Sequence, residues 1–351
     1  MLRSGRVLQA RGGVLFRSAA STAARAGGLQ RGVRSLWTWG NADFGKHGGG
    51  GDAVAEVFAH ELLEPTEMQG VGLAPENLHQ IVAGGAHTML VTVTGRLLSC
   101  GFGETGQLGR GDLQSESFLD DVEGLGPVAM ASCGHWHSAA VTRSGDLNTW
   151  GSNKHGQLGV MLPGGEAETA VPIQVAALAG AKVIAVACGA RHTLAVDAGG
   201  EVYSWGLNHE GQLGHGGRDK LTLPKRIQAC RRRLSQKAFL KALRGVKIVA
   251  IAAGLETSAA VSDKGALFVW GMGRWHQLAT GDNKSREQPV EVLIEGTPVT
   301  WTAVSLGDFH VAGVTTFGEM YTWGLSMYGA LGLSDNALSV VKTPILAANS
   351  M

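Results

Sequence analysis

The sequence has no hydrophobic run long enough to cross a membrane, and it has few cysteines. A membrane-spanning helix needs about eighteen consecutive apolar residues, and none of the 351 residues lies in such a run. The cysteines form no Cys-x-x-Cys pair, so neither a zinc site, a redox motif nor a cofactor is predicted. The net charge is only +1, so overall charge indicates no class of partner. The cysteines are Cys100, Cys133, Cys188 and Cys230.

Acidic residues are absent from the first 36 residues, which contain seven arginines; the first carboxylate is Asp43. An arginine-rich, serine-containing leader without acidic residues is typical of an organellar transit peptide. We therefore predict a transit peptide over residues 1–35 and a mitochondrial location, in the matrix. A chloroplast address and a disordered basic tail that binds nucleic acid are the alternatives.

Glycine is abundant, with 53 residues against 9 prolines, and it marks an internal repeat. The stretch "CGHWHSAAVTRSGDLNTWGSNKHGQLG" from Cys133 aligns without a gap with four others, which begin at Ala83, Cys188, Ala253 and Leu306. In every copy the leading glycine stands seventeen residues before the glycine that follows the second strand. Such constancy is the signature of a repeat architecture. The leading glycines are Gly84, Gly134, Gly189, Gly254 and Gly307.

Each copy contains short apolar or alternating runs separated by turn residues, and a further run follows, such as "PIQV" after Val171. Four short strands per repeat are typical of the blades of a β-propeller. We predict an all-β protein with a propeller over residues 36–351. A partial copy, "LWTWGNADFG" with Trp39 and Gly40, precedes the complete ones. The prediction is therefore about six blades with an incomplete closing blade.

The Gly-x-x-His, Trp-Gly and Gly-Gln-Leu-Gly pattern resembles the regulator of chromosome condensation repeat family over about residues 36 to 345. The resemblance implies a propeller, and members of that family have seven blades. Five complete units and a leading half are fewer than seven. A ring with fewer blades, a shortened gene product and completion by another chain are all compatible with this count.

Histidines and tryptophans recur at equivalent positions of separate units, and Thr257 replaces histidine in one unit. A catalytic or metal centre would bring different ligands to one place, whereas the repeat spreads these side chains over the ring. We assign them structural roles, with each imidazole bonded to backbone groups at a strand end, and we predict no catalytic, cofactor-binding or metal-binding residue. These residues are His87, His137, His192, His310, Trp39, Trp150, Trp205, Trp270 and Trp323.

The stretch between the third and fourth units, at about residues 218–247, holds eleven Lys or Arg residues and one acid, Asp219. Its composition predicts a helical insert. Clustered cations bind RNA phosphates or an acidic protein surface. A solvated basic helix and binding to cardiolipin headgroups are the alternatives. The candidate contact residues are Arg231, Arg232, Arg233, Lys237, Lys241 and Arg244.

These features predict a non-enzymatic scaffold in mitochondria. Its partner would be a protein or ribonucleoprotein complex such as a ribosomal, RNA-processing or respiratory assembly, with RNA contact through the basic insert. Guanine-nucleotide exchange on a small GTPase, the activity of the founding member of the family it resembles, is the alternative. Fold alone does not decide between them.

Overall fold

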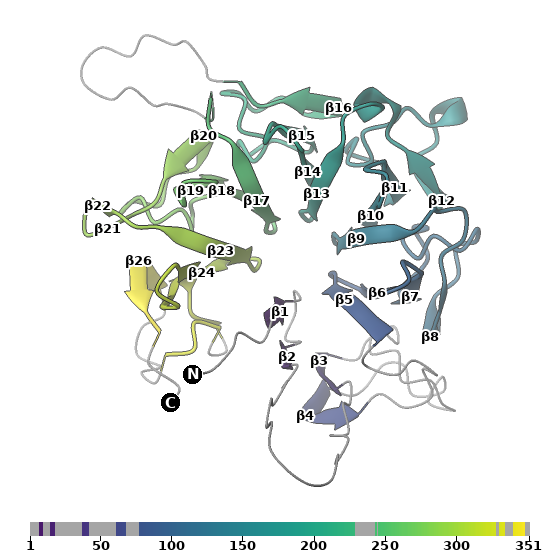
Figure 1. Cartoon of the computed structure of the whole chain (residues 1–351), viewed down its shortest axis with the longest axis horizontal. Coiled ribbons are helices and arrows are strands. Elements are labelled where there is room, and N and C mark those ends of the chain that lie inside the picture. The colour runs from purple at the N-terminus through teal and green to yellow at the C-terminus, as the bar shows by residue number, and fades with distance from the viewer. Residues whose placement is uncertain are drawn as a thin grey trace, which may run out of the picture.

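The chain folds into a ring of antiparallel sheets, and the predicted all-β propeller is confirmed. Five four-stranded sheets occur in the described part of the chain, each with its strands in sequence order. Figure 1 shows them arranged radially around a central axis. The computed structural model describes the backbone of strands β1 to β4 and all of residues 77–228, 243, 245–327, 330–333 and 340–347.

We number the complete blades 1 to 5 in chain order. Blade 1 contains β5 (Leu78–Ala83), β6 (His87–Thr92), β7 (Leu97–Gly101) and β8 (Glu116–Asp121). Blade 2 contains β9 (Val128–Cys133), β10 (His137–Thr142), β11 (Leu147–Ser152) and β12 (Glu168–Gln174). Blade 3 contains β13 (Val183–Cys188), β14 (His192–Asp197), β15 (Val202–Gly206) and β16 (Leu221–Arg226). Blade 4 contains β17 (Ile248–Ala253), β18 (Thr257–Ser262), β19 (Leu267–Gly271) and β20 (Arg286–Glu291). Blade 5 contains β23 (Trp301–Leu306), β24 (His310–Thr315), β25 (Met320–Leu325) and β26 (Val340–Leu346).

A two-stranded sheet lies between blades 5 and 1 in the ring (Figure 1). It pairs β3 (Trp37–Asn41), which contains Trp39, with β4 (Glu61–Glu67). The register of this pair matches the two outer strands of the complete blades. The predicted incomplete blade is therefore confirmed, and we call it the partial blade.

The remaining elements are short. Two of them lie in the segment for which a transit peptide is predicted. No helix of the described residues has the length and apolar character needed to span a membrane. The elements are β1 (Val7–Gln9), β2 (Leu15–Arg17), β21 (Leu293–Ile294), β22 (Thr297–Pro298) and the 3-10 turns η4 (Pro163–Gly165) and η5 (Ala176–Leu178).

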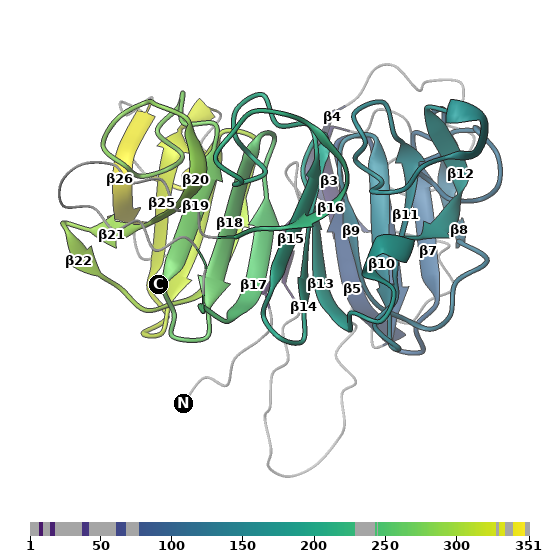
Figure 2. The same ribbon diagram turned by 90° about the horizontal axis from the view of Figure 1, so that it is seen from above.

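In each complete blade the first strand lies nearest the axis and the fourth lies at the rim (Figure 1). The strands run between the two faces of the ring (Figure 2). The apolar core lies between neighbouring blades. Trp205 of blade 3, for example, belongs to one cluster with Leu158 and Val175 of blade 2.

A tryptophan closes each seam between complete blades. Trp205 is fully buried, and its Nε1 donates a 2.9 Å hydrogen bond to the backbone carbonyl of Gln157 in blade 2. That glutamine belongs to the Gly-Gln-Leu-Gly turn, so the turn of one blade holds the indole of the next. The equivalent bonds run from Trp150 to Gln107, from Trp270 to Gln212 and from Trp323 to Gln277.

The repeated histidines reach across the same seams. The Nε2 of His137 lies 2.9 Å from the hydroxyl of Thr193 in blade 3, and that hydroxyl donates to the carbonyl of Gln157. A hydroxyl has one proton, which is used on Gln157, so the imidazole must donate through Nε2–H. The partner is thus a side chain of the next blade, and the backbone partner expected from the sequence is wrong. His87 bonds Ser138 and His192 bonds Ser258 in the same way.

Blade 4 has no seam histidine, and blade 5 correspondingly has no hydroxyl to bond it. Thr257 replaces the histidine, and its hydroxyl donates to the carbonyl of Met272 in its own blade. The position that would accept from a histidine is Val311 in blade 5, which is buried and has no hydroxyl. Histidine and hydroxyl are therefore lost together, as expected when an unpaired buried polar group is costly.

Two of the repeated glycines are needed because the blades approach each other closely. A Cβ at Gly134 would lie 2.5 Å from the carbonyl oxygen of Gly189 and 2.5 Å from the ring of His137. A Cβ at Gly159 would lie 2.7 Å from Nε1 of Trp205, and this glycine also has a φ of +71°. Any side chain at either position would push two blades apart.

Burial favours the neutral form of the imidazoles of His87 and His310. It lowers the pKa of His87 from 6.5 to about 3, and the nearby His135 lowers it further. Burial also lowers the pKa of His310. A neutral ring suits a residue that donates Nε2–H to a hydroxyl, as His87 does to Ser138.

The threonine and valine found at Thr257 and Val311 can be introduced at the equivalent positions of blades 1 and 2, which are His87 and Ser138. We expect Ser138→Val to destabilise the protein by about 1–3 kcal/mol, because Nε2–H of His87 is left unpaired. The double variant His87→Thr, Ser138→Val should be more stable than the sum of the single changes by about 1 kcal/mol. Urea unfolding of all three variants measures this coupling. Strict additivity would show that the pair does not interact.

The lowered pKa of His87 predicts acid sensitivity. Below pH 6.5 the unfolded chain takes up a proton at this residue, whereas the native state does not until about pH 3. The free energy of unfolding should therefore fall as the pH drops through this range, by up to about 1.4 kcal/mol per pH unit for such a group. Urea unfolding at several pH values should give a shallower slope for His87→Thr, Ser138→Val. An unchanged slope would assign the acid sensitivity to other groups.

Candidate functional site

One face of the ring is built from two kinds of connection, and we call it the turn face. The turns between first and second strands lie there, together with the loops that follow the third strands. In every complete blade a backbone hydrogen bond joins the two, because the residue after the Trp-Gly position donates to the residue before the histidine position. The bonds are Phe102 to Ala86, Ser152 to Trp136, Leu207 to Arg191, Met272 to Glu256 and Leu325 to Phe309.

Aromatic side chains meet on this face at two seams. Phe102 of blade 1 packs edge-on against Trp136 of blade 2, with ring centroids 5.6 Å apart. Trp275 of blade 4 packs edge-on against Phe309 of blade 5 at 6.1 Å. Trp136 is 36% exposed. Partly exposed aromatic rings with a fixed orientation are typical anchors for a protein partner.

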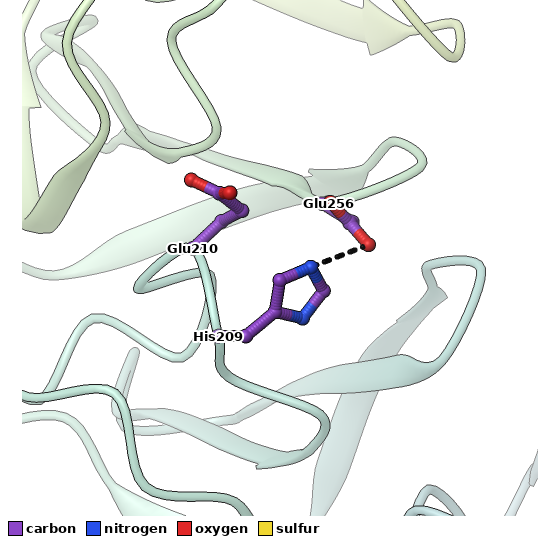
Figure 3. Close-up of side chains that lie close together, drawn as sticks. All are labelled: His209, Glu210 and Glu256. Carbon is purple, nitrogen blue, oxygen red and sulfur yellow. Dashed lines mark ion pairs between the residues drawn. The ribbon is translucent and has the colours of Figure 1, made fainter.

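Charged and titratable side chains occupy the two seams between these aromatic pairs. At the seam of blades 2 and 3, burial lowers the pKa of His155, and nearby Arg191 and Lys220 lower it further. At the seam of blades 3 and 4, Nε2 of His209 lies 3.0 Å from a carboxylate oxygen of Glu256 (Figure 3). From blade 1 to blade 5, the four seams of the turn face are thus apolar, polar, polar and apolar.

The His209 seam also offers the one candidate metal cluster found in the described part of the chain. Ligand atoms of His209, Glu210 and Glu256 lie within 4.8 Å of one another. However, Glu210 accepts a hydrogen bond from Ser285, and Glu256 is paired with His209. Figure 3 shows the Glu210 carboxylate turned away from that pair. We therefore interpret the cluster as the polar counterpart of the aromatic seam contacts.

A contact between a histidine and an aspartate spans the axis on the same face. Nε2 of His135 in blade 2 lies 3.5 Å from a carboxylate oxygen of Asp308 in blade 5. These blades are not neighbours in the ring, so the contact crosses the mouth of the central channel. A Cβ at Gly85 of blade 1 would touch the His135 ring at 3.0 Å. The turn face is therefore continuous across its centre.

The candidate residues from the sequence are found in different places. The histidines and tryptophans of the complete blades lie in the seams, apart from the exposed face, and Trp39 lies in β3. The helical insert was predicted at about residues 218–247, but this start is wrong, because residues 221–226 form β16, the outer strand of blade 3. Ile227 and Leu243 pack in one core cluster. The six candidate contacts of the insert lie outside the described residues: Arg231, Arg232, Arg233, Lys237, Lys241 and Arg244.

The sequence interpretation missed the aromatic pairs of the turn face. Their signal is present in the repeat, at the position directly before each seam histidine. The leading glycine two residues earlier is repeated, and so is the histidine directly after it except at Thr257, whereas this position changes in every copy. It holds Ala86, Trp136, Arg191, Glu256 and Phe309.

Sequence comparison places this chain among known propellers. The profile of the RCC1-like domain matches residues 35–350. The chain is 34% identical to the ultraviolet-B receptor UVR8 of Arabidopsis thaliana over 278 residues, which cover 78% of this chain and 59% of the receptor. It is 30% identical to the secretion-regulating guanine nucleotide exchange factor of Bos taurus, over 85% of this chain and 61% of that protein. It is 32% identical to the human E3 ubiquitin-protein ligase HERC2, over 76% of this chain and 5% of the ligase. The chain thus spans less than two thirds of these relatives.

Solved structures agree with the sequence matches. Human WBSCR16 superposes with a TM-score of 0.74 at 25% identity, over 90% of this chain and 77% of that one. Prp20p of Saccharomyces cerevisiae, described with its binding to Gsp1p and histones, has a TM-score of 0.56 at 19% identity, over 90% of this chain and 86% of Prp20p, and shows the fold alone. From the repeat, the propeller and the profile match, the chain belongs to the RCC1-like domain family.

Proposed function

We propose that this chain is a non-enzymatic scaffold in mitochondria whose turn face holds a protein or ribonucleoprotein assembly. RCC1-like propellers are interaction proteins or exchange factors for small GTPases. The observation that carries the proposal is the contrast between the seams and the turn face. The seams repeat the same buried contacts, while the turn-face position before each seam histidine carries a different side chain in each blade; this position is exposed at Trp136 and Arg191, half-buried at Glu256 and Phe309, and buried at Ala86. Variation limited to an exposed rigid surface is what a specific binding site requires.

The chemistry of the histidines supports a non-enzymatic role. A general base must reach the proton it abstracts and have a pKa near the working pH. His87 is fully buried, bonds Ser138 at 2.7 Å and has a pKa of about 3. The arginine-rich leader supports the mitochondrial location. A ribosomal, RNA-processing or respiratory assembly is the proposed class of partner.

Guanine-nucleotide exchange is the second candidate. The match to the bovine exchange factor over 85% of this chain favours it. So does the likeness in fold to Prp20p, which binds Gsp1p. A small GTPase would then be the main partner on the ring, and the basic insert would be incidental to the activity.

The turn face can be tested with two aromatic variants and a matched control. We expect Trp136→Ala and Phe309→Ala to reduce recovery of the assembly at least tenfold, since buried aromatic anchors contribute most to an interface. Phe317→Ala is the control, because this 88% exposed ring lies in the turn between β24 and β25, at the opposite end of the strands. The measurement is a tagged pull-down from purified mitochondria, with and without RNase, quantified by mass spectrometry.

The outcomes of the pull-down separate the two functions. Ribosomal, RNA-processing or respiratory subunits that depend on Trp136 and Phe309 would support the scaffold. Recovery of a nucleotide-free small GTPase, with faster release of labelled GDP when the purified chain is added, would replace the scaffold by the exchange factor. Loss of binding in Phe317→Ala alone would move the site to the other face.

The basic insert is tested separately by charge reversal. Changing Arg231, Arg232 and Arg233 to glutamate should weaken binding to an RNA-containing assembly and reduce its salt dependence, because fewer counterions are released. The measurement is retention of the assembly over a range of salt concentrations, with the wild-type chain in parallel. Unchanged retention and an unchanged salt slope would show that the insert makes no contact.

A further inference from the structure

Most outer strands of the ring have a proline at the same register position, which prevents another strand from pairing with their free edges. The register of each outer strand with its inner neighbour puts a proline at the same place in the partial blade and in blades 2 to 5. Proline has no N–H group, so another strand cannot pair at that point. The prolines are Pro65 in β4, Pro172 in β12, Pro224 in β16, Pro289 in β20 and Pro344 in β26.

A loop of the preceding blade also hydrogen-bonds to the beginning of some of these outer strands. Gly111 in the loop of blade 1 donates its N–H to the carbonyl of Ala170 in β12. Gly216 in the loop of blade 3 donates to the carbonyl of Glu287 in β20. The loop of one blade thus caps the outer strand of the next before its proline is reached. An exposed strand edge promotes unwanted pairing, which these contacts prevent.

The outer strand of blade 1 departs from this pattern. Thr149 pairs with Ile173 in blade 2, and Ser99 pairs with Asp120 in blade 1, so Leu119 of β8 stands where Pro172 stands in β12. The sheet does not need an N–H at this place, since five equivalent strands have proline there. The N–H of Leu119 therefore faces away from β7.

The neighbouring groups on β8 suit an added strand. Phe118 is 54% exposed beside Leu119, and its carbonyl accepts a 2.8 Å hydrogen bond from Arg110, which holds the backbone in place. The next outward N–H, that of Asp121, is bonded by the side chain of Asp120 at 2.8 Å. Rotation of the exposed Asp120 side chain would release that N–H for pairing.

The charge around β8 indicates the kind of strand that fits. Residues 111–126 contain five acids and no lysine or arginine. Asp121 is paired with Arg96, and Asp120 beside it is exposed. A second copy of β8 in antiparallel pairing would place acid against acid, which is unfavourable. A segment that carries lysine or arginine would instead neutralise them.

We propose that β8 binds an extended segment of a partner protein, rich in lysine or arginine, as a fifth strand of blade 1. Main-chain hydrogen bonds at Leu119 supply the pairing, as in other cases of strand addition. Asp120 and Glu116 select a basic segment, and Phe118 packs on an apolar residue of the guest. This site lies at the rim of the ring, separate from the turn face, so it does not depend on the scaffold proposed above.

A defined peptide tests the pairing. The probe is a capped, fluorescent hexapeptide of alternating lysine and valine, and the control peptide alternates glutamate and valine. Fluorescence anisotropy should show binding of the lysine peptide to the full chain. Leu119→Pro should weaken it at least tenfold, because the N–H is removed, while Leu119→Val retains the N–H and should bind as the wild type does. Asp120→Lys should also weaken binding.

Each result decides the proposal. Leu119→Pro is expected to fold, since the equivalent strands accept proline, and its unfolding midpoint checks this. Equal binding by Leu119→Pro and Leu119→Val would overturn strand addition, as would no binding to the wild-type chain. Equal binding of both peptides would overturn the selection for basic residues.

Photo-crosslinking identifies the natural occupant. Benzoylphenylalanine replaces Phe118 in the full chain expressed in cells, and the control places it at Val171 on the proline-closed β12. A crosslink at position 118 to a lysine- or arginine-rich segment of another protein, lost with Leu119→Pro, would support the proposal. A crosslink to residues 229–244 of a second copy, or equal crosslinking from position 171, would refute it.

Discussion

The ring depends on one carbonyl oxygen at each seam. The carbonyl of Gln157 accepts two hydrogen bonds from blade 3, one from the indole of Trp205 and one from the hydroxyl of Thr193. His137 then completes the network by donating to that hydroxyl from blade 2. A buried network of this kind fixes the relative position of the two blades that contribute to it. Because both motifs contribute to one network, Gly-x-x-His and Gly-Gln-Leu-Gly recur together.

A fixed seam leaves the turn-face positions beside it free to differ. Trp136, Arg191 and Glu256 follow the same backbone path, yet they bring an aromatic ring, a cation and an anion to equivalent places. The ring is therefore a rigid frame on which binding side chains are changed without effect on the fold. The rim follows the same principle, since Leu119 replaces a proline without altering the register of β8.

The relatives illustrate how little the frame specifies. Proteins named as a photoreceptor, a ubiquitin ligase and an exchange factor all share at least 30% identity with this chain over most of its length. The common part is the propeller, and the activities depend on side chains placed on it or on further parts of those longer proteins. The turn face and β8 are the surfaces where the side chains of this chain differ from one repeat to the next.

The sequence by itself determined the repeat, the all-β architecture and the partial blade around Trp39, because the spacing of glycines, histidines and tryptophans is a local property of each unit. It also pointed to the position before each histidine, although that variation was not recognised as a surface. Only the tertiary structure showed that His137 bonds a hydroxyl 56 residues away and that Phe102 meets Trp136. Only strand register revealed that Leu119 stands in place of a proline. The first two are contacts between units and depend on how blades pack, while the register at Leu119 depends on how β8 pairs with β7; no single repeat encodes either.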